Sequence, residues 1–164
     1  MTELASDTAM VLAAGLGKRM RPLTASQPKP LVRVAGKPLV DHALDRLAEA
    51  GVAKAVVNVH YLGDALEAHV LERAAPRVTI SDEREQLLET GGGMVRAQGL
   101  LPDPFFCINS DNIWLDGPRD AFHDLSQAWD AAPASAARPS VPHPMPGRDR
   151  GRRLSARRAR CCRC

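Results

Sequence analysis

Short apolar runs alternate with longer amphipathic segments along the first 130 residues of the chain. The runs have the length of buried strands, and in the longer segments apolar residues recur at helical spacing. The expected strands are residues 9–14, 53–59, 77–80 and 104–108, and the expected helices are residues 38–50, 62–73, 91–100 and 118–129. This regular alternation with short connections predicts an α/β fold with a parallel, doubly wound sheet.

Proline and glycine residues divide this pattern into segments. Pro38 is expected at the first position of a helix, and Gly51 is expected just beyond the end of that helix. Residues 15–30 form a polar loop in which three prolines prevent a helix, and a brief strand is expected at residues 31–34. Ordered loops of this length are more often functional than idle.

Three polar or glycine-rich segments fall near one edge of the expected sheet. Gly15 follows the first strand, Glu89 to Gly92 lie at the start of the third helix, and Asp111 follows the last strand. In open parallel sheets, ligands bind outside the carboxyl ends of the strands. The three segments are therefore expected to converge on one site.

Composition narrows the class of protein. A chain of 164 residues is long enough for one domain with a sizeable core, and 45% of its residues are hydrophobic. Because no run approaches the roughly 18 apolar residues of a membrane helix, no membrane partner is expected. Residues 1–8 lack the features of a secretory signal, so we expect a cytoplasmic protein. Three of the four cysteines lie in the last four positions, without the paired spacing of a zinc site.

Charge separates the folded part of the chain from a basic tail. Nine of the 22 basic residues but only one of the 19 acidic residues lie within residues 131–164, which leaves the first 130 residues with a net charge of −5. We therefore divide the chain into a domain at 1–132 and a tail at 133–164 that is rich in Arg, Pro and Ala. The tail fits a disordered segment or an arginine-rich arm that binds RNA or an acidic partner. The interpretation we favour is out-of-frame sequence after a frameshift or truncation near residue 132. Nucleic acid is not an expected partner of the folded part.

The sequence LAAGLGKRMRP, from Leu12 to Pro22, carries the strongest chemical signal. It places a glycine-rich turn directly after an apolar strand and is followed by the triplet Pro28-Lys29-Pro30. Its spacing excludes a Walker loop and a dinucleotide fingerprint, since the required residues are absent. Glycines without a Cβ let backbone N–H groups approach phosphates, and cations neutralise them. The cations are Lys18, Arg19, Arg21 and Lys29.

This motif, with PKPLV, VAGKPLV, ETGGG and NSD further along, closely resembles the sugar-1-phosphate nucleotidyltransferases. Within them it is most similar to N-acetylmuramate-1-phosphate uridylyltransferases and the related mannose-1-phosphate guanylyltransferases, over roughly residues 9–130. The resemblance implies a Rossmann-like nucleotide-diphospho-sugar transferase fold, here incomplete at its C-terminal end. It also implies transfer of a nucleoside monophosphate from a nucleoside triphosphate, UTP favoured, to a sugar 1-phosphate, with release of pyrophosphate.

The resemblance also assigns roles to individual residues. Arg19 and Lys29 are the expected catalytic residues, and Asp111 is expected to hold Mg²⁺, an ion that prefers carboxylate, water and phosphate oxygens. Glu89 to Gly93 is the segment expected to meet the base. The expected nucleotide-binding residues are Ala13, Ala14, Gly15, Gly17, Lys18, Arg19, Lys29, Glu89, Gly91 and Gly92.

Plainer interpretations exist for each feature taken singly. The glycines fit an ordinary turn, the cations fit a solvated face, and Asp111 fits a helix cap. Members of the resembled family are longer, and their later part supplies much of the sugar pocket and a second metal-binding aspartate. We therefore keep open a nucleotide-binding remnant with feeble turnover, a GTP-using guanylyltransferase, and an RNA-binding protein that acts through its tail.

Overall fold

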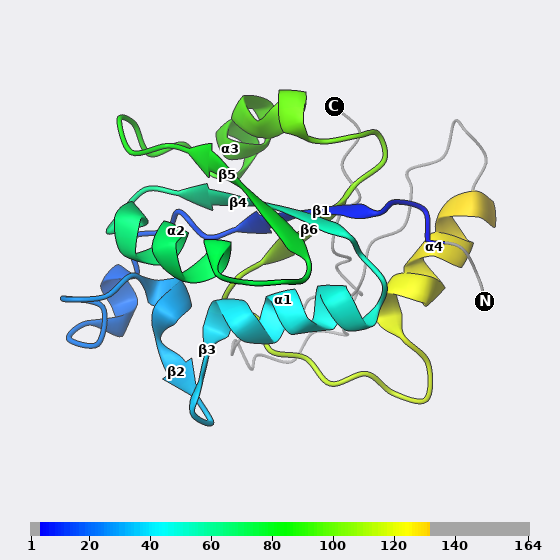
Figure 1. Ribbon diagram of the computed structural model, residues 1–164, viewed down its shortest axis with the longest axis horizontal. Helices are drawn as coiled ribbons and strands as arrows, with labels where there is room; N and C mark the ends of the chain where they lie inside the picture. The colour runs from blue at the N-terminus through cyan, green and yellow to red at the C-terminus, as the bar shows by residue number, and fades with distance from the viewer. Residues whose placement is uncertain (1–3, 132–164) are drawn as a thin grey trace, which may run out of the picture.

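A computed structural model describes residues 4–131, and the tail predicted at residues 133–164 lies outside this range. Four parallel strands form the central sheet in the order β5-β4-β1-β6 (Figure 1). Their bounds are β1 (Thr8–Leu12), β4 (Lys54–Val59), β5 (Arg77–Asp82) and β6 (Phe106–Asn109). The predicted parallel α/β sheet is confirmed.

The strand order reverses once. From β1 the chain moves outward through β4 to β5, and then crosses back to place β6 on the other side of β1. The order therefore changes direction between β1 and β6. Ligands of open α/β sheets bind in the crevice at such a point, outside the carboxyl ends of the strands. Within residues 4–131, β6 pairs with β1 alone.

Helices cover both faces of the sheet, as expected for a doubly wound fold. Figure 1 shows α1 (Leu39–Glu49) and α3 (Thr90–Ala97) on opposite sides of the strands. The larger core joins one face of the sheet to α1, to α2 (Gly63–Leu71) and to α4 (Ala121–Ala131); its members include Ala9, Val11, Val40, Leu44, Val57, Leu66, Phe106 and Phe122. The smaller core packs α3 on the other face; it includes Met10, Val56, Ala97 and Phe105.

The first strand and the first helix start or end differently from the prediction. Strand β1 ends at Leu12 rather than at residue 14, because the N–H groups of Ala13 and Ala14 turn to a side chain and not to a neighbouring strand. Pro38 is the N-cap residue of α1 and not its first helical residue. It also pairs in a small antiparallel hairpin of β2 (Arg33–Val34) and β3 (Lys37–Pro38). Gly51 follows α1 with φ +92°, as expected for a glycine after a helix.

The loop at residues 15–30 contains more structure than its prolines suggested. Two single 3-10 turns, η1 (Lys18–Met20) and η2 (Lys29–Leu31), lie at its start and end. Since η2 includes Leu31, the strand expected at 31–34 shortens to β2. Proline excludes a long helix, yet it is well accommodated at the first positions of so short a turn. Helix α3 already begins at Thr90, so the three glycines that follow belong to its opening turns.

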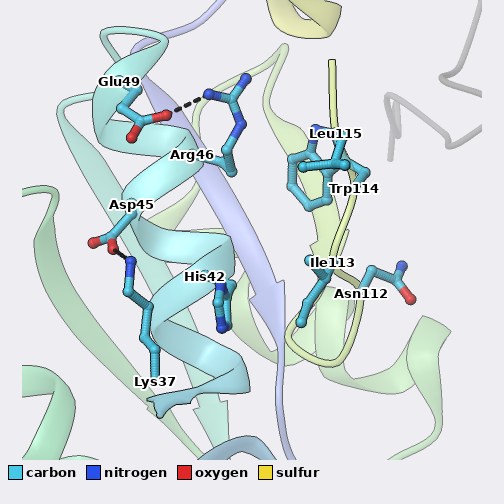
Figure 2. A pocket seen from close by; sticks show the side chains of 9 residues that line it. All are labelled: Lys37, His42, Asp45, Arg46, Glu49, Asn112, Ile113, Trp114 and Leu115. Atoms are coloured by element: carbon cyan, nitrogen blue, oxygen red, sulfur yellow. Dashed lines mark hydrogen bonds and ion pairs between the residues drawn. The ribbon is translucent and has the colours of Figure 1, made fainter. Parts of the chain in front are cut away.

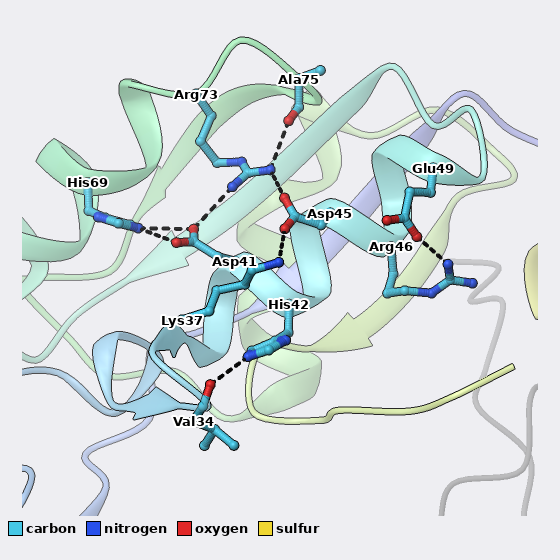
Figure 3. Close-up of polar contacts among 10 residues, drawn as sticks. All are labelled: Val34, Lys37, Asp41, His42, Asp45, Arg46, Glu49, His69, Arg73 and Ala75. Atoms are coloured by element: carbon cyan, nitrogen blue, oxygen red, sulfur yellow. Dashed lines mark hydrogen bonds and ion pairs between the residues drawn. The ribbon is translucent and has the colours of Figure 1, made fainter.

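A network of ion pairs joins α1 to α2 and to the chain after it (Figure 3). Arg73 donates hydrogen bonds to Asp41 and Asp45, Lys37 also pairs with Asp45, and His69 Nε2 lies 3.0 Å from both Asp41 oxygens. Partial burial raises the pKa of Asp45, but the hydrogen bonds from Lys37 and Arg73 outweigh it and hold that pKa below its ordinary value.

In the described range, the helices are all too short or too polar to cross a membrane. The expected cytoplasmic location stays a prediction.

Candidate functional site

Gly17 is held in a conformation and a space that suit only glycine. Its φ is +60°, and an added Cβ would lie 2.9 Å from Thr24 Cγ2 and 3.1 Å from Lys29 Cβ. The buried Thr24 donates its hydroxyl to the Gly17 carbonyl at 2.9 Å. Gly15 differs, since it is exposed and an added Cβ would have no neighbour within 4 Å. The conformation of the turn is therefore constrained by packing at Gly17, whereas the backbone at Gly15 is accessible to solvent.

Lys18 and Arg19 lie on η1, directly after the glycine turn. Lys18 and Arg19 are both exposed, and neither forms an ion pair with any residue in 4–131. Arg21 is exposed as well, two positions further along the loop. These cations are therefore available to an anion that arrives from solvent.

Lys29 is placed by the loop around it. Pro28 and Pro30 are buried, and the N–H of Leu31 donates to the carbonyl of Pro28 at 2.9 Å. This closes a tight turn around Lys29. Its Nζ forms an ion pair with Asp111, and the Lys29 side chain is 26% exposed.

Asp111 is placed by the end of β6. Asn109 is paired with Leu12 of β1, and the N–H of Ser110 donates to the Leu12 carbonyl at 3.1 Å. Asp111 therefore emerges where the strand order reverses, beside the chain that leaves β1. The ion pair with Lys29 brings together two of the residues that the sequence singled out.

Asn58 is part of this site although the sequence analysis did not single it out. It is a buried residue near the end of β4, and its Oδ1 accepts the N–H of Ala13 at 2.6 Å and that of Ala14 at 3.3 Å. Because these N–H groups are already bonded, the involvement of the two alanines with a nucleotide stays a prediction. The signal was present in the sequence, since Asn58 is the one polar residue in the run AVVNV at residues 55–59.

Glu83, also missed, follows β5 and is 1% exposed. Its Oε1 accepts a hydrogen bond from Asn58 Nδ2 at 2.8 Å, and its Oε2 accepts the N–H of Leu88 at 3.3 Å. In the sequence it stands within the charged run DERE, residues 82–85, and nothing marks it as the buried member. Only the path of the chain after β5 turns this one side chain inward.

The segment expected to meet the base lies at the start of α3. Glu89 is the N-cap residue, and its carbonyl accepts the N–H of Gly93 at 2.8 Å. Gly91 has open space around it, whereas an added Cβ at Gly92 would lie 3.1 Å from Leu88 Cβ. At Gly93 it would lie 2.7 Å from Glu83 Oε1. Packing therefore requires glycine most strongly at Gly93, which was not among the expected nucleotide-binding residues.

The carboxyl ends of all four strands contribute to this arrangement. The glycine turn follows β1, Asn58 lies near the end of β4, Glu83 follows β5 and Asp111 follows β6. On one side, Gly17 packs against Lys29, and Lys29 pairs with Asp111. On the other side, Asn58 and Glu83 connect the chain after β1 to the start of α3. The predicted convergence of these segments on one sheet edge is thus observed.

Asp111 is the acidic residue that lies beside the glycine turn and its lysine. No group of three His, Cys, Asp or Glu side chains in residues 4–131 is arranged to hold a metal ion. Mg²⁺ in nucleotide enzymes usually keeps several waters and is bound by one or two carboxylates together with substrate phosphates. The half-buried Asp111 beside Lys29 therefore fits Mg²⁺, provided that a bound phosphate supplies further oxygens.

A cavity of about 130 Å³ lies elsewhere, between α1 and the segment at residues 112–115 (Figure 2). Typical small-molecule pockets measure about 300–1,000 Å³, so it is too small for a nucleoside triphosphate. Arg46, which lines it, forms ion pairs with Glu49, Asp116 and Asp120. The pairs with Asp116 and Asp120 attach the segment after Asp111 to α1.

Comparison with known proteins identifies the family of the chain. A family model described as "Nucleotidyl transferase" matches residues 8–141. The chain is 56% identical over 131 residues to an N-acetylmuramate alpha-1-phosphate uridylyltransferase from Caulobacter vibrioides, covering 77% of this chain and 54% of that protein. It is 42% identical over 111 residues to a mannose-1-phosphate guanylyltransferase catalytic subunit beta from Xenopus tropicalis, covering 64% and 31%.

Solved structures agree on the fold. A UDP-glucose pyrophosphorylase complexed with UDP-glucose aligns with a TM-score of 0.66 at 19% identity, covering 77% of this chain and 54% of that chain. A CTP:phosphocholine cytidylyltransferase from Streptococcus pneumoniae aligns at 0.57 with 30% identity, covering 71% and 49%. The chain spans about half the length of the uridylyltransferase it matches. With a family model that matches most of its residues, the chain belongs to the nucleotidyl transferase family.

Proposed function

We propose that the protein binds a nucleoside triphosphate at the glycine turn and transfers its nucleoside monophosphate to a sugar 1-phosphate. The observation that carries this proposal is the position of the turn, Lys29 and Asp111 together at the point where the strand order reverses. Two relatives named for such a transfer, at 56% and 42% identity, support it.

The reaction needs positioning and charge neutralisation more than covalent chemistry. An oxygen of the sugar phosphate attacks the α-phosphorus, a P–O bond forms, and the bond to pyrophosphate breaks. Gly15 leaves the backbone open to phosphate oxygens, and the planar fork of Arg19 can bind two of them. Lys29, held between buried prolines, would place one positive charge on the phosphates at little entropic cost.

Asp111 is the residue that would hold Mg²⁺. When bound, this ion would neutralise phosphate charge and polarise the reacting phosphoryl group. Asp111 forms an ion pair with Lys29. We infer that Lys29 and Asp111 exchange this contact for the phosphates and the cation when a nucleotide binds.

UTP is the nucleotide we place first. The relatives from Caulobacter vibrioides and Neisseria meningitidis, at 56% and 46% identity, are both named uridylyltransferases of N-acetylmuramate alpha-1-phosphate. The guanylyltransferase from Xenopus tropicalis at 42% supports GTP as the alternative. N-acetylmuramate 1-phosphate is accordingly the first acceptor to test, and mannose 1-phosphate is the second.

Calorimetry and a turnover assay on the full chain test this proposal in two steps. UTP and GTP are titrated with MgCl₂ present, and pyrophosphate release is then followed with each sugar 1-phosphate. We expect UTP to bind more tightly than GTP, and pyrophosphate to form only when the acceptor is added. If neither nucleotide binds, the proposal is wrong.

A second candidate is a nucleotide-binding protein with little or no turnover. It is favoured by the described part of the site, where, within residues 4–131, Asp111 is the one acidic residue that pairs with a cation of the loop after β1. The same assay separates the two candidates, since UTP binding without pyrophosphate release would support the second.

A further inference from the structure

We propose that Glu83 is a positioning residue, which acts through Asn58 to fix the backbone at Ala13 and Ala14 where the glycine turn begins. The inference rests on the nucleotide site proposed above, which it deepens. Glu83 follows β5, on the side of β4 away from β1, and so has no place in the turn itself. Its effect reaches the turn through one intervening side chain.

The direction of the hydrogen bonds makes Asn58 dependent on Glu83. A side-chain amide has one accepting oxygen and one donating NH₂ group, whereas an ionised carboxylate only accepts. With Nδ2 donating to Glu83 at 2.8 Å, the Asn58 oxygen faces the N–H groups of Ala13 and Ala14. If the amide turned over, its NH₂ group would meet those two donors. Glu83 therefore selects the amide orientation that binds the turn.

Burial makes this contact strong and specific. Asn58 is 4% exposed and Glu83 is 1% exposed, so water has little access to replace either partner. A buried polar group that loses its partner bears the full cost of its desolvation, which slows any exchange of partners at this position. A change in the orientation of the Asn58 side chain is thus expected to change the backbone at Ala13 and Ala14 as well.

The second oxygen of Glu83 extends the same contact to the segment expected to meet the base. Oε2 accepts the N–H of Leu88, and Oε1 would lie 2.7 Å from a Cβ added on Gly93. One carboxylate therefore joins the loop before α3, the first turns of α3 and the chain after β1. The phosphate-binding and base-binding segments are held in register by this single side chain.

An exchange of the two side-chain types provides a sharp test. In Asn58→Asp, two carboxylates face each other. In Glu83→Gln, one amide oxygen replaces two carboxylate oxygens, so it can accept from Asn58 or from Leu88 but not from both, and each single change leaves a buried group of the relay without its partner. In the double variant N58D/E83Q, the new amide at position 83 can donate to the new carboxylate at position 58 and accept from Leu88. That carboxylate in turn accepts from Ala13 and Ala14. Every hydrogen bond then has a donor and an acceptor again, at unchanged net charge.

Three quantities are to be measured for each variant and for the unaltered protein. They are the hydrogen-exchange rates of the Ala13 and Ala14 amides, the UTP dissociation constant with MgCl₂ present, and the melting temperature. Each single variant is expected to exchange these two amides at least about tenfold faster and to bind UTP about tenfold more weakly, and the double variant to recover most of both losses. Ser126→Ala is the control, since it also removes the hydrogen bonds of a buried side chain, to Ala5 and Phe122. It is expected to lower the melting temperature without changing UTP affinity.

The possible outcomes separate the two proposals. If single variants retain normal exchange at Ala13 and Ala14, or if the double variant is no better than either single one, the positioning role of Glu83 is wrong. If exchange responds as expected but the unaltered protein does not bind UTP or GTP, the nucleotide site is wrong, and with it any role of Glu83 in binding. Weakened UTP binding with rescue supports both.

Discussion

Lys29 and Asp111, 82 positions apart in the sequence, form an ion pair where the loop after β1 passes the end of β6. Their side chains are 26% and 31% exposed, so the pair faces solvent on one side and the domain on the other. A cation and a carboxylate at one point can receive a phosphate and a divalent ion together.

Replacing Lys29 by Met should weaken UTP binding at least about tenfold, because a charge-assisted contact to phosphate contributes about 1.5–3 kcal/mol. Stability should change little, since a partly exposed ion pair contributes about 0–1 kcal/mol. Lys37→Met is the control, as it removes another ion-paired lysine that lies outside the site. Calorimetry that finds the same loss for both variants would contradict the assignment of Lys29.

The two glycines of the turn should respond differently to alanine. Gly17→Ala places a side chain at φ +60° and against Thr24, so we expect a loss of about 2 kcal/mol in the free energy of unfolding. Gly15→Ala should change stability by less than about 0.5 kcal/mol, because its Cβ would meet no atom of the protein within 4 Å. It should still reduce UTP affinity, because that Cβ would occupy the space in which we expect the phosphates. Urea unfolding and calorimetry on both variants check this. Unchanged UTP affinity in Gly15→Ala would count against close approach of phosphate there.

Arg46→Gln should destabilise the protein by about 1–3 kcal/mol, because it leaves three carboxylates around one site without their cation. These are Glu49, Asp116 and Asp120. Arg77→Gln is the control at an exposed position at the start of β5, and its melting temperature should match that of the unaltered protein. Equal melting temperatures for both variants would show that Arg46 does not attach the segment after β6 to α1.

Asp45 should contribute a pH-dependent part of the stability. Its pKa in the folded protein is lowered, since hydrogen bonds from Lys37 and Arg73 outweigh the opposing effect of burial. Its stabilising effect is therefore present above the unfolded pKa of about 3.9 and is lost as the pH falls through the folded value.

In Asp45→Asn, the loss of unfolding free energy at pH 7 should stay below about 1 kcal/mol and should be smaller at about pH 3, below the unfolded pKa. Urea titrations at both pH values measure it. Asp130→Asn, at an exposed position of α4, should show no difference at either pH. A loss in Asp45→Asn that is as large in acid as at neutral pH would contradict the ionic origin.

The sequence was most informative where a local pattern determines the structure. Apolar periodicity was sufficient to predict the alternating strands and helices, and Gly51 identified the end of α1 through its backbone conformation. The same periodicity was sufficient to predict that the glycine turn and Asp111 lie at one edge of the sheet, because parallel strands place their carboxyl ends together. Their roles in binding and catalysis stay predictions.

Long-range pairing was beyond such patterns. The buried state of Glu83 depends on the path of the chain after β5 and on its contacts with Asn58 and Leu88, 25 and 5 positions away. The end of β1 at Leu12 has the same cause, because a side chain from β4 binds the next two N–H groups. Glycine patterns were also ambiguous, since Gly93 is required by packing while Gly91 is not.

A crystal structure of the full chain with a non-hydrolysable UTP analogue and Mn²⁺ tests the central claim most directly. We predict that the triphosphate lies along Gly15 to Arg19 with Lys29 against its oxygens, and that the anomalous signal of the metal lies beside Asp111. A triphosphate bound at any other place, or a metal far from Asp111, would contradict it.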